Sequence, residues 1–73
     1  PVGPLVELNS GELALVLSAD PHSRLQPKVM VFTNADKRNV LPHKMVDLAR
    51  EATRVGGGLA IRRVVESGAY GVD

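Results

Sequence analysis

The sequence predicts a mostly β domain, built as a small five-stranded barrel or a rolled antiparallel sheet, with room for one short helix around 47–55. Three observations lead to this prediction. Five short apolar stretches follow one another and are separated by turns and loops, as in small barrels. Valine and leucine dominate these stretches, and glycine, proline and asparagine separate them. A chain of 73 residues suffices for one domain, which we expect to span 1–73.

The first two stretches predict a hairpin. Leu5–Leu8 is followed by Asn9, Ser10 and Gly11, a turn sequence in which the glycine suits a positive φ. The second stretch runs from Glu12 to Ser18. Side chains alternate between the two faces of a strand, so this stretch has two apolar sets. The sets are Leu13, Leu15 and Leu17 on one face, and Ala14 and Val16 on the other.

The middle of the chain predicts two more strands. A loop runs from Asp20 to Pro27, and the clearest strand of the sequence, Lys28–Thr33, follows it. A polar turn occupies 34–39. Beyond Pro42, we expect a fourth short strand at 44–48.

The stretch after this strand has mixed signals. Leu48, Ala52 and Val55 fall at helical spacing, and Asp47 is suited to be an N-cap, so one or two helical turns fit here. Three glycines at 56–58 would end any helix. They lack the lysine and serine or threonine of a phosphate-binding loop, so we expect a flexible connection. The fifth strand is expected at 59–66.

Composition and charge restrict the function. Nine Lys+Arg against eight Asp+Glu leave a net charge of +1, which argues against charge-driven nucleic-acid binding. Aromatic residues make up 3%, which leaves little for stacking bases. No apolar run approaches the roughly 18 residues of a membrane helix. The chain has no cysteine, no signal peptide and no initiator methionine, so we expect a piece of a longer, cytoplasmic protein.

No constellation of residues predicts catalysis or metal binding. His22 and His43, together with Asp20 and Asp36, could in principle bind a metal. They lack the paired spacing of metal ligands, so we expect both histidines to be exposed in loops. No serine lies in a nucleophile elbow. We therefore expect no catalytic residue, no metal site and no cofactor within 1–73.

Four arginines form the expected interaction surface. Arg50 and Arg54 have the R-x-x-x-R spacing that resembles the cyclic di-GMP motif of PilZ domains, but the second PilZ element is not matched around Ser67. A solvated basic helix face is the alternative. Arg62 and Arg63 are adjacent in the fifth strand, so one should leave the core face or lie at the end of the barrel.

Three segments together resemble a known pattern. They are 1–16, with Pro1, Gly3 and the Asn9–Gly11 turn; 20–29, with two prolines; and the closing 66–73. Val46–Asp47–Leu48 supplies a further match. This order is similar to the region that follows the catalytic domain in bacterial HD-GYP and related HD-domain phosphohydrolases.

The resemblance implies an accessory role. The family hydrolyses cyclic di-GMP or related phosphodiesters at a cluster of metals held by an H…HD…D pattern, with a G-Y-P loop nearby. The chain contains neither His-Asp nor Gly-Tyr-Pro. The resemblance therefore implies a loosely SH3-like, non-catalytic domain that packs on the catalytic domain of the same chain or mediates formation of a homo-oligomer. A small KOW- or SH3-like nucleic-acid-binding barrel is the alternative.

Overall fold

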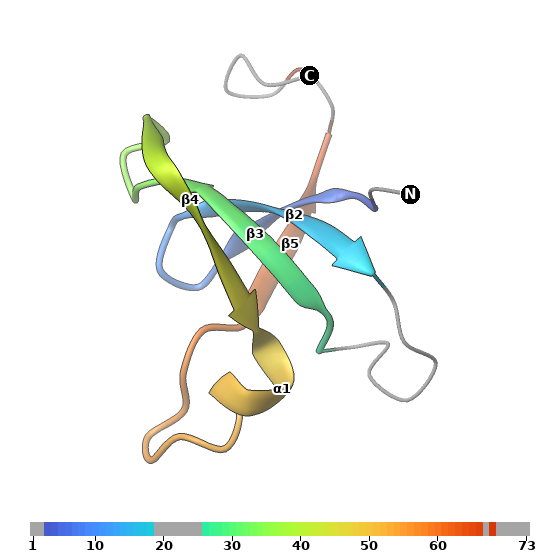
Figure 1. Cartoon of the computed structure of the whole chain (residues 1–73), viewed down its shortest axis with the longest axis vertical. Helices are drawn as coiled ribbons and strands as arrows, with labels where there is room; N and C mark the ends of the chain where they lie inside the picture. The colour runs from blue at the N-terminus through green and yellow to red at the C-terminus, as the bar shows by residue number, and fades with distance from the viewer. Residues whose placement is uncertain (1–2, 19–25, 67, 69–73) are drawn as a thin grey trace.

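The computed structural model describes residues 3–18, 26–66 and 68. Within them the chain forms five antiparallel strands and one short helix (Figure 1). The strands pair in one sheet of order β4-β3-β2-β1-β5. The elements are β1 (Leu5–Leu8), β2 (Leu13–Ser18), β3 (Lys28–Thr33), β4 (Asn39–Asp47), α1 (Leu48–Glu51) and β5 (Ile61–Val65). The prediction of a mostly β domain with one short helix is confirmed.

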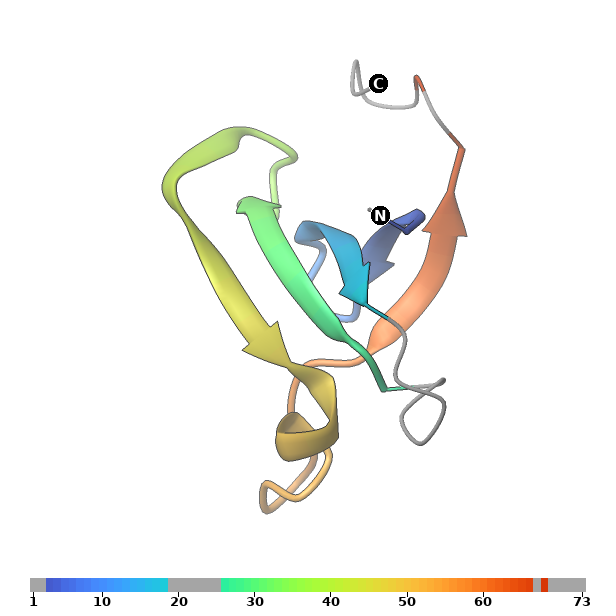
Figure 2. The ribbon, with the colours of Figure 1, turned by 45° about the vertical axis from the view of Figure 1, so that its right-hand side comes forward.

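The sheet is rolled but not closed. Consecutive strands β1 to β4 are neighbours, and β5 returns to pair with β1, so β4 and β5 are the two edges. Figure 2 shows the sheet bending so that these edge strands flank β1, β2 and β3. The rolled antiparallel sheet is thus the observed form, and within the described residues β4 and β5 each pair with a single strand.

Apolar side chains pack on both faces of this sheet. The alternation predicted for β2 is confirmed: Ala14 and Val16 belong to one cluster, while Leu13, with Leu15 packed against it, belongs to the other. The first cluster also contains Val6, Leu8, Val29, Val31, Val46 and Leu48. The second contains Leu5, Phe32 and Val65. All four residues of β1 are buried, because apolar side chains pack against this strand on both faces of the sheet.

The hairpin between β1 and β2 also forms as expected. Gly11 has φ +91°, a conformation that side chains rarely adopt. Next to this turn, where β2 begins and β3 ends, the buried Thr33 hydroxyl accepts a hydrogen bond from the Leu13 backbone N–H at 2.9 Å and donates to the Asn34 carbonyl at 2.9 Å. Thr33 is thereby satisfied in the core.

The fourth strand is longer than predicted. It begins at Asn39 and includes Pro42, whose peptide bond with Leu41 is cis. Proline is tolerated because β4 is an edge strand, where an N–H on the solvent side is not needed. The pairing is irregular here: Val31 lies opposite Lys44 and Thr33 opposite Asn39.

The helical segment predicted at 47–55 is real but short. Helix α1 spans one turn, Leu48–Glu51, and Asp47 is its N-cap, with the carboxylate accepting from the Ala49 N–H at 3.0 Å. The fifth strand begins at Ile61 instead of 59. No helix of the described segments is long and apolar enough to cross a membrane. The predictions for 20–25, 67 and 69–73, including those for Asp20, His22 and Ser67, lie outside the described residues.

Candidate functional site

The four predicted arginines lie in two separate groups. Arg62 and Arg63 are on β5, where both contact Glu7 of β1. Arg50 is on α1, and Arg54 is in the turn that follows α1. Both arginines line a hollow beside the helix. The expected surface is therefore divided between a charge cluster across β1 and β5 and a hollow beside α1.

The charge cluster is centred on Glu7, whose side chain is only 7% exposed. Its Oε2 lies 2.6 Å from Lys37 Nζ, and its Oε1 lies 2.9 Å from Arg63 Nε and 3.9 Å from Arg62 Nη1. Lys37 also donates to the Gly11 carbonyl at 2.6 Å. Hydrogen bonds from Lys37 and then Arg63 hold the pKa of Glu7 below its usual value of 4.5.

Arg62 and Arg63 are both exposed on β5. Both reach Glu7, because a bulge interrupts the β1–β5 register: Glu7 pairs with Arg63 and Leu8 with Ile61, which leaves Arg62 extra. Arg62 also donates to the Asn9 carbonyl at 2.6 Å. The bulge thus recruits both arginines to one carboxylate.

Sequence reasoning missed Glu7. The signal for its position was available, since Glu7 alternates with Leu5 and shares its face of β1. Its partners could not be read from the sequence, because Lys37 and Arg63 are 30 and 56 residues away along the chain. The ion pairs of Glu7 therefore connect β1 with β5 and with the β3–β4 turn.

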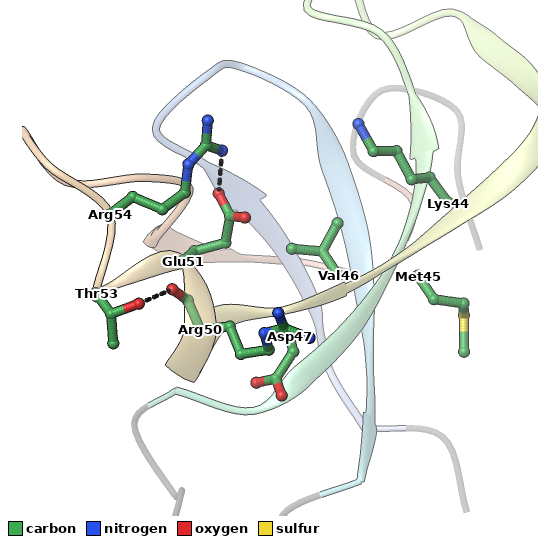
Figure 3. A pocket seen from close by; sticks show the side chains of 8 residues that line it. All are labelled: Lys44, Met45, Val46, Asp47, Arg50, Glu51, Thr53 and Arg54. Atoms are coloured by element: carbon green, nitrogen blue, oxygen red, sulfur yellow. Dashed lines mark hydrogen bonds and ion pairs between the residues drawn. The ribbon is translucent and has the colours of Figure 1, made fainter.

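The second group lines a hollow of about 460 Å³ between β4 and α1 (Figure 3). Its walls carry charges of both signs, and Figure 3 shows Lys44 and Met45 leaving β4 in different directions. Arg54 Nη1 lies 3.2 Å from Glu51 Oε1, so the Arg54 side chain forms an ion pair within the hollow. The lining residues are Lys44, Met45, Val46, Asp47, Arg50, Glu51, Thr53 and Arg54.

Glu51 also fixes the segment that follows α1. Its Oε1 accepts from the Leu59 N–H at 2.9 Å, and this bond, with Arg54, lowers its pKa below the usual 4.5. Asn9 holds the same segment by donating to the Gly58 carbonyl at 3.0 Å and accepting from the Ala60 N–H at 3.2 Å. The three-glycine connection is therefore anchored at its C-terminal end, where full flexibility was expected.

The remaining candidates fit structural roles. His43 lies on β4, not in a loop, and is exposed, with its ring 6.3 Å from that of Phe32 in edge-to-face geometry. The Ser10 hydroxyl donates to Glu12 within the first hairpin at 2.6 Å. In the described ranges, no three His, Cys, Asp or Glu side chains group to hold a metal.

Comparison with known proteins identifies the family. Residues 5–67 match the family described as KOW domain associated with HD domain. The chain belongs to this family. Over 50 residues, or 68% of the chain, it is 46% identical to a protein of Pseudomonas aeruginosa strain PAO1 named cyclic di-GMP phosphodiesterase PA4108. No solved structure gives a significant match.

The match to this relative is confined to a small part of it. The shared region is 12% of the relative's length, so the chain is comparable to one portion of that protein and not to the whole. The resemblance to a region associated with HD domains, deduced from the turn and strand motifs, is confirmed.

Proposed function

We propose that the chain is a non-catalytic accessory domain that packs on the HD domain of the same polypeptide in a bacterial, cytoplasmic cyclic di-GMP phosphodiesterase of the HD-GYP type. The family match over residues 5–67 carries this proposal. The identity to a protein named as a cyclic di-GMP phosphodiesterase supports the substrate class. The catalytic metal cluster and its ligands would be supplied by the HD domain, and cyclic di-GMP would bind there.

Deletion of 1–73 from the parent protein, defined as the HD-domain protein that carries this chain, tests the proposal. The shortened protein should keep its bound metals and some hydrolysis of cyclic di-GMP, because the catalytic groups lie elsewhere. It should unfold at a lower temperature, because a packed neighbour is lost. Unchanged thermal unfolding would contradict packing. Complete loss of hydrolysis with the metals still bound would contradict a non-catalytic role.

The isolated chain should bind neither metal nor cyclic di-GMP. Arg54 is paired with Glu51, and the second PilZ element is not matched around Ser67. We therefore expect no paired-arginine clamp of the PilZ type. Calorimetric titration of the chain with cyclic di-GMP checks this expectation. Micromolar binding that is lost in the Arg50→Ala variant would overturn it.

A KOW-like nucleic-acid interface is the second candidate, because the family is a KOW family. The charge distribution weighs against it, since Lys37, Arg62 and Arg63 converge on the Glu7 carboxylate instead of presenting a phosphate-binding row. Gel shifts with single-stranded and duplex RNA at two salt concentrations discriminate the two functions. Salt-dependent RNA binding by the chain would favour the nucleic-acid function.

A further inference from the structure

One row of apolar side chains crosses the entire sheet on a single face. The strand registers place Val65 opposite Leu5, Leu5 opposite Leu15, Leu15 opposite Met30, and Met30 opposite Met45. The row therefore runs from β5 through β1, β2 and β3 to the edge strand β4. Both methionines of the chain are neighbours in it.

Burial decreases along this row toward β4. Val65 is 3% and Leu5 is 8% exposed, Leu15 and Met30 are half-buried, and Met45 is 67% exposed. The row thus begins in the core and ends as exposed apolar surface on the edge strand β4. Methionine side chains are flexible and polarizable, which suits them to fit an irregular partner surface.

Positive charge lies beside the exposed end of the row. Lys28 and Arg50 line a hollow of about 400 Å³ together with Met45, Val46 and Asp47. The Asp47 carboxylate is occupied as the N-cap of α1. Lys28 and Arg50 are exposed and make no ion pair with the described residues. This end of the row is therefore apolar with a basic margin.

The other exposed apolar side chains lack this setting. Val64 is 65% exposed, but it points to the opposite face, and its partner Val6 is buried. Val55 is fully exposed in the turn after α1, and Leu41 lies at the irregular part of β4. Single exposed apolar residues are ordinary on protein surfaces, whereas a continuous row with a charged margin is typical of an interface.

We propose that the Leu15–Met30–Met45 row, with Lys28 and Arg50 at its margin, is the surface that meets the HD domain. The partner surface is an apolar patch with acidic side chains at its edge. This inference rests on the proposed function and adds the contact surface to it. A second copy fits less well, because a two-fold contact would bring the same basic margins together. The matched region is 12% of the relative, so most of such a polypeptide lies outside this domain and is tethered beside it.

Thiol labelling of the intact parent protein tests the surface. The chain contains no cysteine, so Met45→Cys introduces a unique thiol within it, and Val64→Cys is a control of equal exposure on the other face. Labelling by iodoacetamide is followed peptide by peptide with mass spectrometry, and each rate is divided by its rate in denaturant. We expect the Met45→Cys thiol to react about tenfold or more slowly than the Val64→Cys thiol, as for a site that is covered about 90% of the time.

A charge reversal supplies the second arm. Arg50→Glu in the Met45→Cys background should raise the labelling rate about threefold or more, because it opposes an acidic partner edge. Arg38→Glu is the matched control, since Arg38 is exposed in the β3–β4 turn. It should leave the rate unchanged. Both variants alter exposed side chains. An unchanged far-ultraviolet circular dichroism spectrum confirms that each variant is folded.

The outcomes separate this inference from the proposed function. Rapid labelling of Met45→Cys in a parent that deletion of 1–73 destabilises would overturn the surface and leave the function standing. Slow labelling of Val64→Cys instead would place the contact on the other face. Protection of Met45→Cys that disappears on dilution would assign the row to self-association and overturn the HD-domain partner. If deletion changes nothing, the proposed function itself fails.

Discussion

At the scale of single residues, Glu7 is the most informative side chain. It is a nearly buried carboxylate within an apolar strand, and such a group is stable only when it is paired. Lys37 and Arg63 contact its two oxygens. Lys37 itself lies in the β3–β4 turn with a left-handed backbone conformation, φ +67°. The Glu7 cluster thus explains why two turns and two strands meet at one point.

The first prediction concerns the acid stability of the chain. The pKa of Glu7 is lowered in the folded state, so the unfolded state binds more protons below the usual value of 4.5. The stabilisation is therefore complete above about pH 4.5 and is lost as the pH falls through the folded pKa. Denaturant unfolding between pH 3 and pH 7 should show Glu7→Gln to be less stable at pH 7 and less sensitive to acid.

Part of the acid sensitivity should survive in that variant, because the pKa of Glu51 is lowered as well. A Glu7→Gln variant as stable as the wild type at pH 7 would show that the ion pairs of Glu7 contribute nothing. Glu12→Gln, in the first hairpin, is the comparison variant.

The second prediction distinguishes two glycines of the same loop. A Cβ on Gly58 would lie 2.6 Å from both the backbone O and the Oε1 of Glu51, whereas Gly56 has φ +81° and open space around it. Gly56→Ala should cost about 1 kcal/mol for the left-handed backbone alone. Gly58→Ala should cost about 2 kcal/mol or more, because it also displaces the Glu51 anchor. Urea unfolding of both variants measures the difference, and equal losses would contradict this ranking.

At the scale of elements, α1 is too short to be stable by its own propensity. A single helical turn needs tertiary contacts and a cap. Leu48 is buried in the first core cluster, and Asp47 caps the N-terminus. The helix therefore depends on β4, from which it continues directly.

The third prediction tests that dependence. Asp47→Ala should destabilise the chain by about 1 kcal/mol, because the Ala49 N–H loses its acceptor. Asp47→Asn retains a side-chain oxygen and should cost much less. Thermal unfolding followed by circular dichroism compares the two variants. If Asp47→Asn and Asp47→Ala destabilise the chain equally, the negative charge of Asp47 stabilises the helix and the hydrogen bond to the Ala49 N–H does not.

The sequence predicts these elements unevenly, for physical reasons. Alternation correctly predicts β2 and its two faces, because apolar residues fill both. The cap at Asp47 is equally local and is found. The start of β4 is missed because tolerance of Pro42 depends on the strand lying at an edge, a property of the whole sheet. The shared contact of Arg62 and Arg63 depends on a bulge, which alternation cannot reveal.

At the scale of the whole molecule, the fold is a rolled sheet with two open edges and apolar residues on both faces. Its small size limits the surface that it can bury. Along one face, the row that ends at Met45 continues the core out to the edge strand β4. A domain that belongs to a family associated with HD domains, and that carries this surface, fits a role as a fixed neighbour of a catalytic domain.

The rotational correlation time of this domain within the intact parent protein tests the central claim most directly. Amide ¹⁵N relaxation of β1, β2 and β3, measured on a parent labelled only in this segment, reports how the domain tumbles. Packing on the HD domain predicts a correlation time equal to that of the whole parent. A value close to that of a free 73-residue domain would show that it moves independently on a linker and would contradict the account.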